Sequence, residues 1–313
     1  MNDDRAAGSV LARLARPAGP HTRFAVVADP HVATRAEGTS KLFEHSRDHL
    51  AAAVADINDR AVDAVLSPGD LTKDGEPWNY DAVDEVLSDL DAPFYAVPGN
   101  HDVPKESDEH DRLPVSGFAE RYGPGELPFR VEVGGLDVLG VNSSGTSDRL
   151  YDSHDGRVTD ADRAWLADAL ADAERPVVLV HHNFPPVSDQ VEAHREAEPE
   201  MALPPVMRDP DPLAETLVEG GADVAFTGHY HLPATGFYGG VREIAAPTTC
   251  SFPQAYLLCE TTPDGTTVRF VPVADEAGLG RAHALRTADS VTSRGLTALA
   301  AARVASFPLV DES

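Results

Sequence analysis

Short apolar runs alternate with longer amphipathic segments along the N-terminal third of the chain. The runs Arg23–Ala28, Val62–Leu66 and Pro93–Val97 are too short for helices and end near Pro, Gly or Asp, which is typical of buried strands. Between them, Ser40–Arg60 and Pro77–Leu90 are expected to form helices, and apolar residues of the first share one face. The order strand, helix, strand, helix, strand predicts a parallel sheet with right-handed crossovers.

The middle and the C-terminal half predict a second sheet. Phe129–Val133 and Leu136–Val141 flank Gly134-Gly135, which is a strong hairpin signal. Thr159-x-x-Asp162 resembles a capping box that opens a further helix. Short strands follow the hairpin, and the last three are expected to complete the second sheet: Val177–Val180, Val224–Thr227, Val241–Ile244, Tyr256–Cys259 and Val268–Val273.

The chain is expected to fold as one domain, because no change of composition divides it. Residues 21–280 would form its body, and an apolar content of 42% is enough to bury a core. We expect residues 1–20 to form a loosely attached leader with a short helix over Gly8–Ala15. We expect residues 281–313 to form a helical tail. Two Pro-rich stretches are expected to be a loop over the site and a lid or disordered excursion: residues 103–125 and 185–212.

Five of the predicted strands end in residues that can bind a metal ion. Parallel sheets place their ligands beyond the carboxyl ends of the strands, so these side chains are expected to meet. A polar residue at one strand end means little, but five such ends together describe a site. The candidate ligands are Asp29, His31, Asp70, Asn100, His181, His229 and His231.

These side chains offer carboxylate, imidazole and amide donors and no thiolate. The set suits manganese, iron or zinc better than a structural zinc site built on cysteines, and it leaves the metal undecided. Two neighbouring ions can clamp a displacement at phosphorus if a group bridges them. Asp70, with two oxygens and a central position in the chain order, is the predicted bridge. His229 and His231 project to the same side of an extended segment, so each can serve a different ion.

The ordered block of motifs resembles the calcineurin-like metallophosphoesterase superfamily. Each motif alone is weak, but the ordered set is specific and spreads over about 200 of the 313 residues. The resemblance implies an α/β fold, a four-layer α/β/β/α sandwich with two mixed sheets. The motifs that carry it are Asp29-x-His31, Gly69-Asp70, Gly99-Asn100-His101-Asp102, His181-His182 and Gly228-His229-x-His231.

The resemblance also implies roles for individual residues. A hydroxide held on the ions would be the nucleophile. His101 would contact the phosphate oxygen or protonate the leaving alkoxide, and Asp102 would orient His101. The implied ligands are Asp29, His31, Asp70 and His231 for one ion, and Asp70, Asn100, His181 and His229 for the other.

Within the superfamily, the motifs look most like the branch of class III cyclic-nucleotide phosphodiesterases and glycerophosphodiesterases. Residues 69–75 with Tyr80, and residues 97–102, carry this likeness. Lys73 stands where purple acid phosphatases have a tyrosine, which argues against that branch. Lys73 could contact a phosphate oxygen or stay a solvated lysine, and His182 could contact substrate or serve in packing.

The charge pattern disfavours several partners. The chain has 25 Lys and Arg against 52 Asp and Glu, a net charge of −27, so no nucleic acid is expected to bind. Its lysines are Lys41, Lys73 and Lys105 only, and this acidic, lysine-poor composition predicts a halophile. Without a membrane-length apolar run or a signal-peptide pattern, we expect a cytoplasmic protein that binds no membrane. Cys250 and Cys259 are expected to be reduced.

The expected function is metal-dependent hydrolysis of a small phosphodiester, of the cyclic nucleotide or glycerophosphodiester type. A phosphomonoesterase with the same site is the alternative. A binding scaffold without catalysis is more remote, because every expected ligand is present. A nuclease is disfavoured by the missing basic groove. A serine hydrolase lacks its Gly-x-Ser-x-Gly elbow, and an NTPase lacks its Gly-rich phosphate loop. The oligomeric state stays open.

Overall fold

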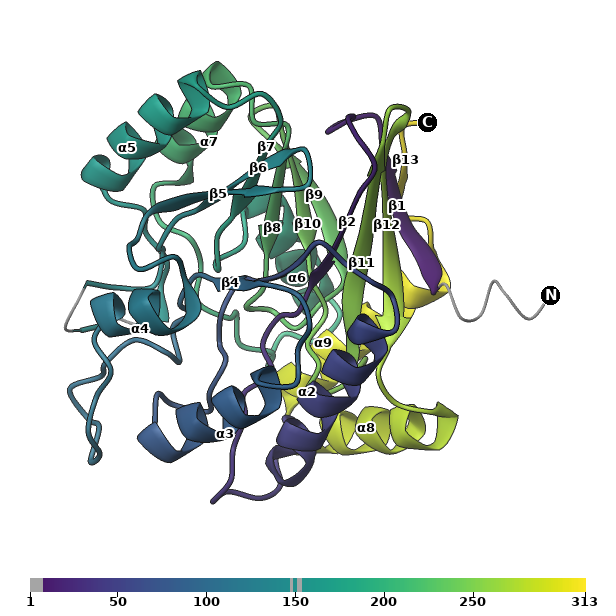
Figure 1. Ribbon diagram of the computed structural model, residues 1–313. Helices are drawn as coiled ribbons and strands as arrows, with labels where there is room; N and C mark the ends of the chain where they lie inside the picture. The colour runs from purple at the N-terminus through teal and green to yellow at the C-terminus, as the bar shows by residue number, and fades with distance from the viewer. Residues whose placement is uncertain (1–7, 147–148, 151–153) are drawn as a thin grey trace.

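The computed structural model describes residues 8–146, 149–150 and 154–313. Within these residues the strands form two mixed sheets that face each other (Figure 1). The seven-stranded sheet has the order β13-β1-β12-β11-β2-β3-β4, and the six-stranded sheet has the order β5-β6-β7-β8-β10-β9.

The first sheet consists of β1 (Ser9–Leu14), β2 (Thr22–Val26), β3 (Ala64–Ser67), β4 (Phe94–Ala96), β11 (Ala255–Thr262), β12 (Gly265–Pro272) and β13 (Val310–Asp311). The second consists of β5 (Phe129–Val133), β6 (Leu136–Gly140), β7 (Pro176–Leu179), β8 (Val224–Thr227), β9 (Ala234–Tyr238) and β10 (Val241–Ala245). The helices are α2 (Phe43–Asn58), α3 (Pro77–Leu87), α4 (Val115–Tyr122), α5 (Asp160–Ala171), α6 (Pro185–Arg195), α7 (Pro210–Glu219), α8 (Glu276–Asp289) and α9 (Val291–Ala305).

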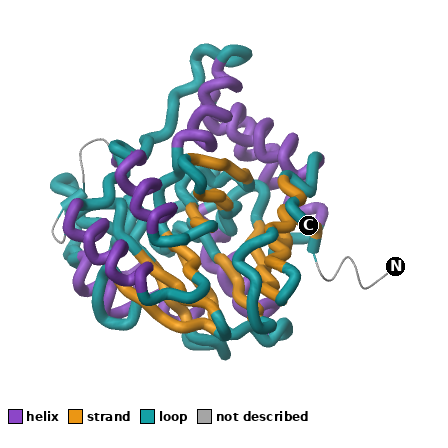
Figure 2. The backbone as a smooth tube through the Cα atoms, turned by 90° about the horizontal axis from the view of Figure 1, so that it is seen from above, coloured by secondary structure: helices purple, strands orange, loops and turns teal. Residues whose placement is uncertain are grey.

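Side chains of the central strands alternate between apolar layers. Phe24 and Val26 of β2 join the core between the sheets, where Phe24 meets Phe226 edge to face at 5.7 Å between ring centroids. Ala25 and Val27 point the other way, into the core beneath α2, α3 and α4. In the second sheet, the outward residues of β7 and β8 pack beneath α5 and α7. Helices thus cover the strands from outside, as Figure 2 shows, and the predicted fold class is confirmed.

Local patterns predicted several elements correctly. β2, β3 and β4 pair in parallel, and the helices α2 and α3 connect them. The Gly134-Gly135 hairpin joins β5 and β6 in antiparallel register. At the start of α5, Thr159 Oγ1 accepts a hydrogen bond from the backbone N–H of Asp162 at 3.1 Å, as the capping pattern predicts.

The predicted helix over Gly8–Ala15 is wrong, because this segment forms strand β1. β1 pairs antiparallel with β12, and its register shifts between Val10 and Ala12. Leu11, Ala12 and Leu14 are buried in the core between the sheets. An isolated helix this short is marginal, since nucleation is costly, whereas the edge of β12 supplies backbone partners. The described part of the predicted leader is therefore built into the first sheet.

Two of the three strands predicted to complete the second sheet belong to the first. β10 does pair with β8 in the second sheet, but β11 lies between β12 and β2. The second sheet ends instead at β9, which the apolar pattern does not predict. Periodicity identifies a strand, but its neighbours depend on which sheet edges the rest of the chain leaves open.

The two Pro-rich stretches contain helices that were not predicted. α4 lies within residues 103–125 and buries Phe118 and Tyr122. In residues 185–212, α6 starts with two prolines, which are tolerated in the first turn of a helix because its N–H groups lack helical partners. The predicted helical tail, residues 281–313, contains the second half of α8, the whole of α9 and then β13, which pairs with β1.

A buried carboxylate joins β10 to the ends of β7 and β8. Glu243 accepts hydrogen bonds from Thr227 Oγ1 at 2.6 Å, Asn183 Nδ2 at 2.9 Å and the backbone N–H of Phe184 at 3.1 Å. Despite these donors, burial raises the pKa of Glu243 to about 7. Ionised Glu243 is therefore costly in the folded protein, although its contacts hold two strand ends together.

We predict that Glu243→Gln reduces the pH dependence of stability. The folded protein keeps the Glu243 proton up to about pH 7, whereas the unfolded chain releases it near the ordinary pKa of 4.5. Between these values the native state binds more protons, so stability falls as the pH rises, by about 3 kcal/mol in total. Glutamine does not titrate, so the unfolding free energy of the variant should fall less between about pH 5 and about pH 8.

Urea unfolding of both proteins at the two pH values measures this difference. The variant should be less stable at every pH. Its amide has only one acceptor oxygen, so its NH2 group would face one of the three donors that now bind Glu243. Glu132→Gln, at an exposed position of β5, is the matched control and should keep the pH slope of the unaltered protein. An unaltered slope in Glu243→Gln would contradict the prediction.

Candidate metal centre

Five of the seven predicted ligands have a left-handed backbone. The angle φ is 49° at Asp29, 41° at His31, 55° at Asp70, 72° at His229 and 52° at His231. Residues with a Cβ rarely adopt positive φ, and such strained positions concentrate at functional sites. Each of these residues follows the end of β2, β3 or β8. The sharp turns after these strands therefore point to function and not to packing alone.

Gly69 and Gly99 let the turns after β3 and β4 approach closely. A Cβ on Gly69 would lie 2.2 Å from Gly99 N, and one on Gly99 would lie 2.1 Å from Asp70 Oδ1. Such contacts are far too short, so only glycine fits either position. The close approach lets Asp70 Oδ1 accept a hydrogen bond from the backbone N–H of His101 at 2.8 Å. The other carboxylate oxygen, Oδ2, is then available to the site.

The first group of donors comes from the ends of β2, β3 and β8. Asp29, His31, Asp70 and His231 each offer one atom, and these atoms all lie within 4.8 Å of one another. His31 Nε2 lies 3.4 Å from Asp70 Oδ2, and His231 Nε2 lies 3.6 Å from Asp29 Oδ1. All four residues are buried. This is the complete ligand set predicted for one ion.

The second group of donors comes mainly from the other sheet. His181 Nε2 lies 3.0 Å from Asn100 Oδ1 and 3.5 Å from Asp70 Oδ2. His181 Nδ1 faces Pro68 O at 2.8 Å, which leaves Nε2 for the site. His229 lies beside His181 with ring centroids 5.0 Å apart. The structure thus places Asn100 and Asp70 Oδ2 beside His181, and the three donor atoms that lie within 4.8 Å of one another on this side belong to His181, His182 and His229.

Burial sets the charges of these groups. It raises the pKa of Asp29, and the neighbouring charge of Asp70 raises that pKa further. Burial acts in the same direction on Asp70, but the surrounding imidazoles, first of all His181, outweigh it and lower the pKa of Asp70. Burial also lowers the pKa of the imidazoles, to about 3 at His229. Metals bind neutral imidazoles and ionised carboxylates. Burial favours the neutral imidazoles, the lowered pKa of Asp70 favours its ionised form, and a bound cation would replace the proton of Asp29, so the donor set fits metal ions.

His101 is held by a different carboxylate from the one predicted. Its Nδ1 lies 2.7 Å from Lys73 O and 3.0 Å from Asp74 Oδ1. Among the hydrogen bonds of the described residues, Asp102 makes none to the His101 ring. Asp102 instead accepts from the backbone N–H groups of Leu71, Thr72 and Gly99 at 3.0 to 3.1 Å. The structure therefore gives the orienting position to Asp74, and Asp102 fastens the turn that carries Asp70.

The two weaker substrate-binding candidates do not line the central cavity. His182 is buried, with Nδ1 at 2.9 Å from Ser143 Oγ and Nε2 at 2.9 Å from His154 O. Lys73 Nζ pairs with Asp74 Oδ2 at 2.5 Å and with Glu76 at 3.7 Å. Both side chains thus contact protein groups, and a ring nitrogen of His182 also lies within 4.8 Å of donor atoms of His181 and His229.

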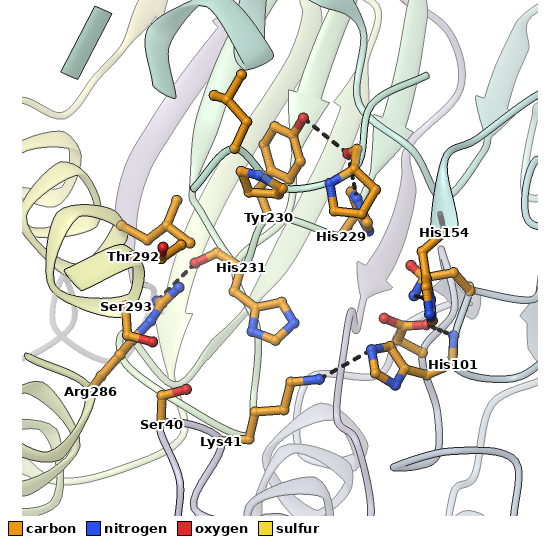
Figure 3. Close-up of a pocket in the computed structure, with 16 residues that line it drawn as sticks. Ser40, Lys41, His101, His154, His229, Tyr230, His231, Arg286, Thr292 and Ser293 are labelled. Atoms are coloured by element: carbon orange, nitrogen blue, oxygen red, sulfur yellow. Dashed lines mark hydrogen bonds between the residues drawn. The ribbon is translucent and has the colours of Figure 1, made fainter. Parts of the chain in front are cut away.

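A cavity of about 430 Å³ opens beside the two groups of donors (Figure 3). Asp70, Asn100, His101, His229 and His231 line it on the side of the strand ends. The apolar and helical periodicity of the sequence did not identify several other lining residues. Among these are Lys41, His154, Leu203, Arg286, Ser293 and Leu296.

The only sequence signal for Lys41 is the rarity of lysine in this chain. His154 Nδ1 lies 3.0 Å from Asn100 Nδ2, a contact across 54 residues that no local pattern predicts. Arg286 of α8 donates to the backbone oxygens of His231 and Phe252. These residues reach the site through long-range packing.

Within the described part of the chain, no helix is both long and apolar enough to cross a bilayer. The cytoplasmic location stays a prediction. The comparisons with known proteins do not support the halophilic origin predicted from the composition.

Comparison with known proteins gives related sequences over most of the central part of the chain. A probable cyclic nucleotide phosphodiesterase of Psychrobacter arcticus is 28% identical over 192 residues, which are 60% of this chain and 63% of that protein. The chain thus matches a little less than two thirds of this relative. Another probable cyclic nucleotide phosphodiesterase, from Rhodopseudomonas palustris, is 29% identical over 237 residues, 70% of this chain and 75% of that protein.

The fold also resembles a solved structure. A dimetal phosphatase from Danio rerio superposes with a TM-score of 0.60 and 15% identity, covering 82% of this chain and 98% of that one. At this identity the likeness concerns the fold. The family model for calcineurin-like phosphoesterases matches residues 22–233, which hold all seven candidate ligands. The chain therefore belongs to the calcineurin-like phosphoesterase family.

Proposed function

We propose that this protein is a metal-dependent hydrolase of small phosphodiesters. The observation that carries the proposal is the position of Asp70 Oδ2, which lies 3.4 Å from His31 Nε2 and 3.5 Å from His181 Nε2. One carboxylate oxygen is thus shared by donors that follow strands of different sheets. Two-metal sites that cleave phosphoesters depend on two ions held close together, and a shared carboxylate supplies that proximity.

The two groups of donors would hold one ion each. Manganese, iron and zinc all suit nitrogen and oxygen donors, and they are the proposed metals. When bound, such ions act as Lewis acids on the phosphoester and lower the pKa of water at the site. The proposed ligands are Asp29, His31, Asp70 and His231 for one ion, and Asp70, Asn100, His181 and His229 for the other.

His101 is placed to serve the leaving group. Lys73 O and Asp74 Oδ1 are acceptors, so Nδ1 of His101 carries a proton and Nε2 faces the cavity (Figure 3). From Nε2, the protonated ring can donate a proton to the alkoxide that leaves when the P–O bond breaks. Asp74 Oδ1, 3.0 Å from Nδ1, fixes the direction of the ring. Asp74 is thus a positioning residue for His101.

The cavity supports a substrate with an organic group beside the phosphate. Leu203 and Leu296 contribute apolar surface, and the hydroxyl groups of Ser40 and Ser293 lie on the same cavity lining. A cyclic nucleotide or a glycerophosphodiester presents both apolar and hydroxyl-bearing parts. The names of the Psychrobacter and Rhodopseudomonas relatives point to the same class of substrate. A monoesterase would use the same ligands, so substrate comparison must separate the two.

Metal removal and a substrate panel test the proposed function. Chelation should abolish hydrolysis of bis(4-nitrophenyl) phosphate, and added Mn²⁺, Fe²⁺ or Zn²⁺ should restore it, because the ligands fit a metal centre. Cyclic nucleotides and glycerophosphodiesters should be cleaved faster than simple monoesters. Hydrolysis that survives chelation, or a clear preference for monoesters, would contradict the proposal.

Asn100→Ala should reduce turnover much more than stability. The substitution removes an oxygen that lies 3.0 Å from His181 Nε2, and it frees His154 from its amide contact. Loss of such a ligand should lower kcat by roughly 10- to 100-fold, by analogy with other changes at metal sites. Steady-state kinetics and thermal unfolding measure the two effects.

The matched control is Asn58→Ala, at the C-terminal end of α2. Asn58 contacts the backbone of Asp89 and Asp91, and it is not among the residues that line the cavity. This variant should lose some stability and keep its turnover. Equal kcat values for Asn100→Ala and the unaltered protein would argue against a role of Asn100 in the reaction.

Asp74→Asn should slow the cleavage of poor leaving groups more than that of good ones. The neutral amide of the variant would hold the His101 ring less firmly than the carboxylate does, so Nε2 would be less well placed to donate a proton to the leaving alkoxide. With a 4-nitrophenolate leaving group, which needs no proton, the loss should be small. We expect kcat for an alkyl phosphodiester to fall by roughly 10-fold or more. Equal losses with both substrates would show that Asp74 does not act through the leaving-group proton.

A further inference from the structure

Lys41 brings an ammonium group to the edge of the candidate metal centre. Its Nζ lies 3.2 Å from His31 Nδ1 and 3.4 Å from His101 Nε2. Figure 3 shows the side chain directed toward His101 across the cavity, and Lys41 lines the same cavity as Asp70 and Asn100. The ammonium therefore lies between a candidate ligand and the group proposed to serve the leaving alkoxide.

The other lysines of the chain are neutralised by carboxylates. Lys73 and Lys105 both pair with Asp74, at 2.5 Å and 3.5 Å. Among the described residues, no carboxylate lies within ion-pair distance of Lys41. Arg286, the other non-histidine cation in the cavity lining, donates to the backbone oxygens of His231 and Phe252. Lys41 is thus the cation that the described part of the protein leaves available to an anion in this cavity.

The two imidazole partners of Lys41 do not satisfy its three N–H donors. His31 Nε2 belongs to the first group of metal donors, so its proton must lie on Nδ1, the atom that faces Lys41. Two donors then oppose each other at this contact. His101 Nε2 lies 3.4 Å from Nζ, at the long end of the range for a hydrogen bond. The two imidazoles therefore leave at least one of the three N–H donors of Lys41 for an acceptor from outside the protein.

A strained turn holds Lys41 in this position. Thr39 and Leu42, on either side, have φ of 63° and 50°. The Lys41 N–H donates to Thr39 Oγ1 at 3.2 Å, and the Gly38 N–H donates to Glu44 Oε2 at 2.7 Å. Leu42 is 2% exposed and anchors the turn in the protein interior. A turn of two left-handed residues is costly, and here it directs a lysine toward the cavity.

We propose that Lys41 binds a non-bridging oxygen of the substrate phosphoryl group. This inference rests on the proposed function, because it assumes that the cavity receives a phosphoester. A phosphoryl oxygen would accept a hydrogen bond from an N–H of Nζ that neither imidazole accepts. The contact would be a charge-assisted hydrogen bond, which is about twice as strong as a neutral one. Lys41 then contributes to substrate binding, and His101 is left to serve the leaving group.

The test compares binding of inorganic phosphate by metal-loaded Lys41→Met, Lys41→Arg and the unaltered protein. Isothermal titration calorimetry should show an affinity roughly 10- to 100-fold lower for Lys41→Met, because one charge-assisted hydrogen bond is lost. Lys41→Arg keeps the charge and should keep most of the affinity. The metal content of all three proteins, measured by elemental analysis, should be equal. With bis(4-nitrophenyl) phosphate, KM should rise in Lys41→Met more than kcat falls.

Arg47→Met is the matched control, because Arg47 lies on α2 and pairs with Glu85 at 2.9 Å. It should bind phosphate like the unaltered protein. Unchanged phosphate affinity in Lys41→Met would overturn the proposal, as would a fall in kcat alone or a loss of metal. A protein that hydrolyses no phosphoester would refute the proposed function, whereas the phosphate titration would still decide the role of Lys41.

Discussion

The buried carboxylate of Asp70 lies close to candidate ligands that follow strands of both sheets. It follows β3 of the first sheet, and one of its oxygens lies 3.5 Å from His181, which follows β7 of the second. Asp29 is buried nearby, so two carboxylates share one largely buried site beside the cavity. Burial of a charge is costly unless opposite charge compensates it. The arrangement is therefore stable only with cations or protons among the donors, and the neutral imidazoles leave this role to metal ions.

Several contacts hold the strained ligands where this charge balance requires them. Asp29 accepts from the backbone N–H of His229 at 3.0 Å, and its own carbonyl accepts from Thr248 Oγ1 at 2.7 Å. The carboxylate of Asp102 accepts hydrogen bonds from three backbone N–H groups in and beside the Asp70 turn. Burial raises the pKa of Asp102 to about 7, and the charge of Asp70 adds to this effect. Polar side chains that surround the ligands thus sustain left-handed turns that would be unfavourable in an isolated chain.

The sequence alone predicted the parts of this structure that depend on residues close together in the chain. Strand ends with a ligand, the capping of α5 and the glycine hairpin are local patterns, and they were correct. The position of β11 beside β2 depends on contacts across more than 200 residues, so periodicity could not predict it. Asp102 follows His101 directly in the chain, whereas Asp74 lies 27 residues before it. Only the turn geometry decides which carboxylate reaches the ring, and the structure favours Asp74.

The candidate ligands and the walls of the cavity come from different parts of the chain. All seven ligands lie within residues 22–233, the range of the family match, whereas Arg286, Ser293 and Leu296 lie beyond it. Arg286 ties α8 to the backbone of His231, so the C-terminal helices are attached directly to a ligand turn. Substitution of Ser293 or Leu296 would change the wall of the cavity without replacing any of the seven candidate ligands. Under the proposed function, substrate choice would therefore depend on residues outside the range of the family match as well as on residues within it.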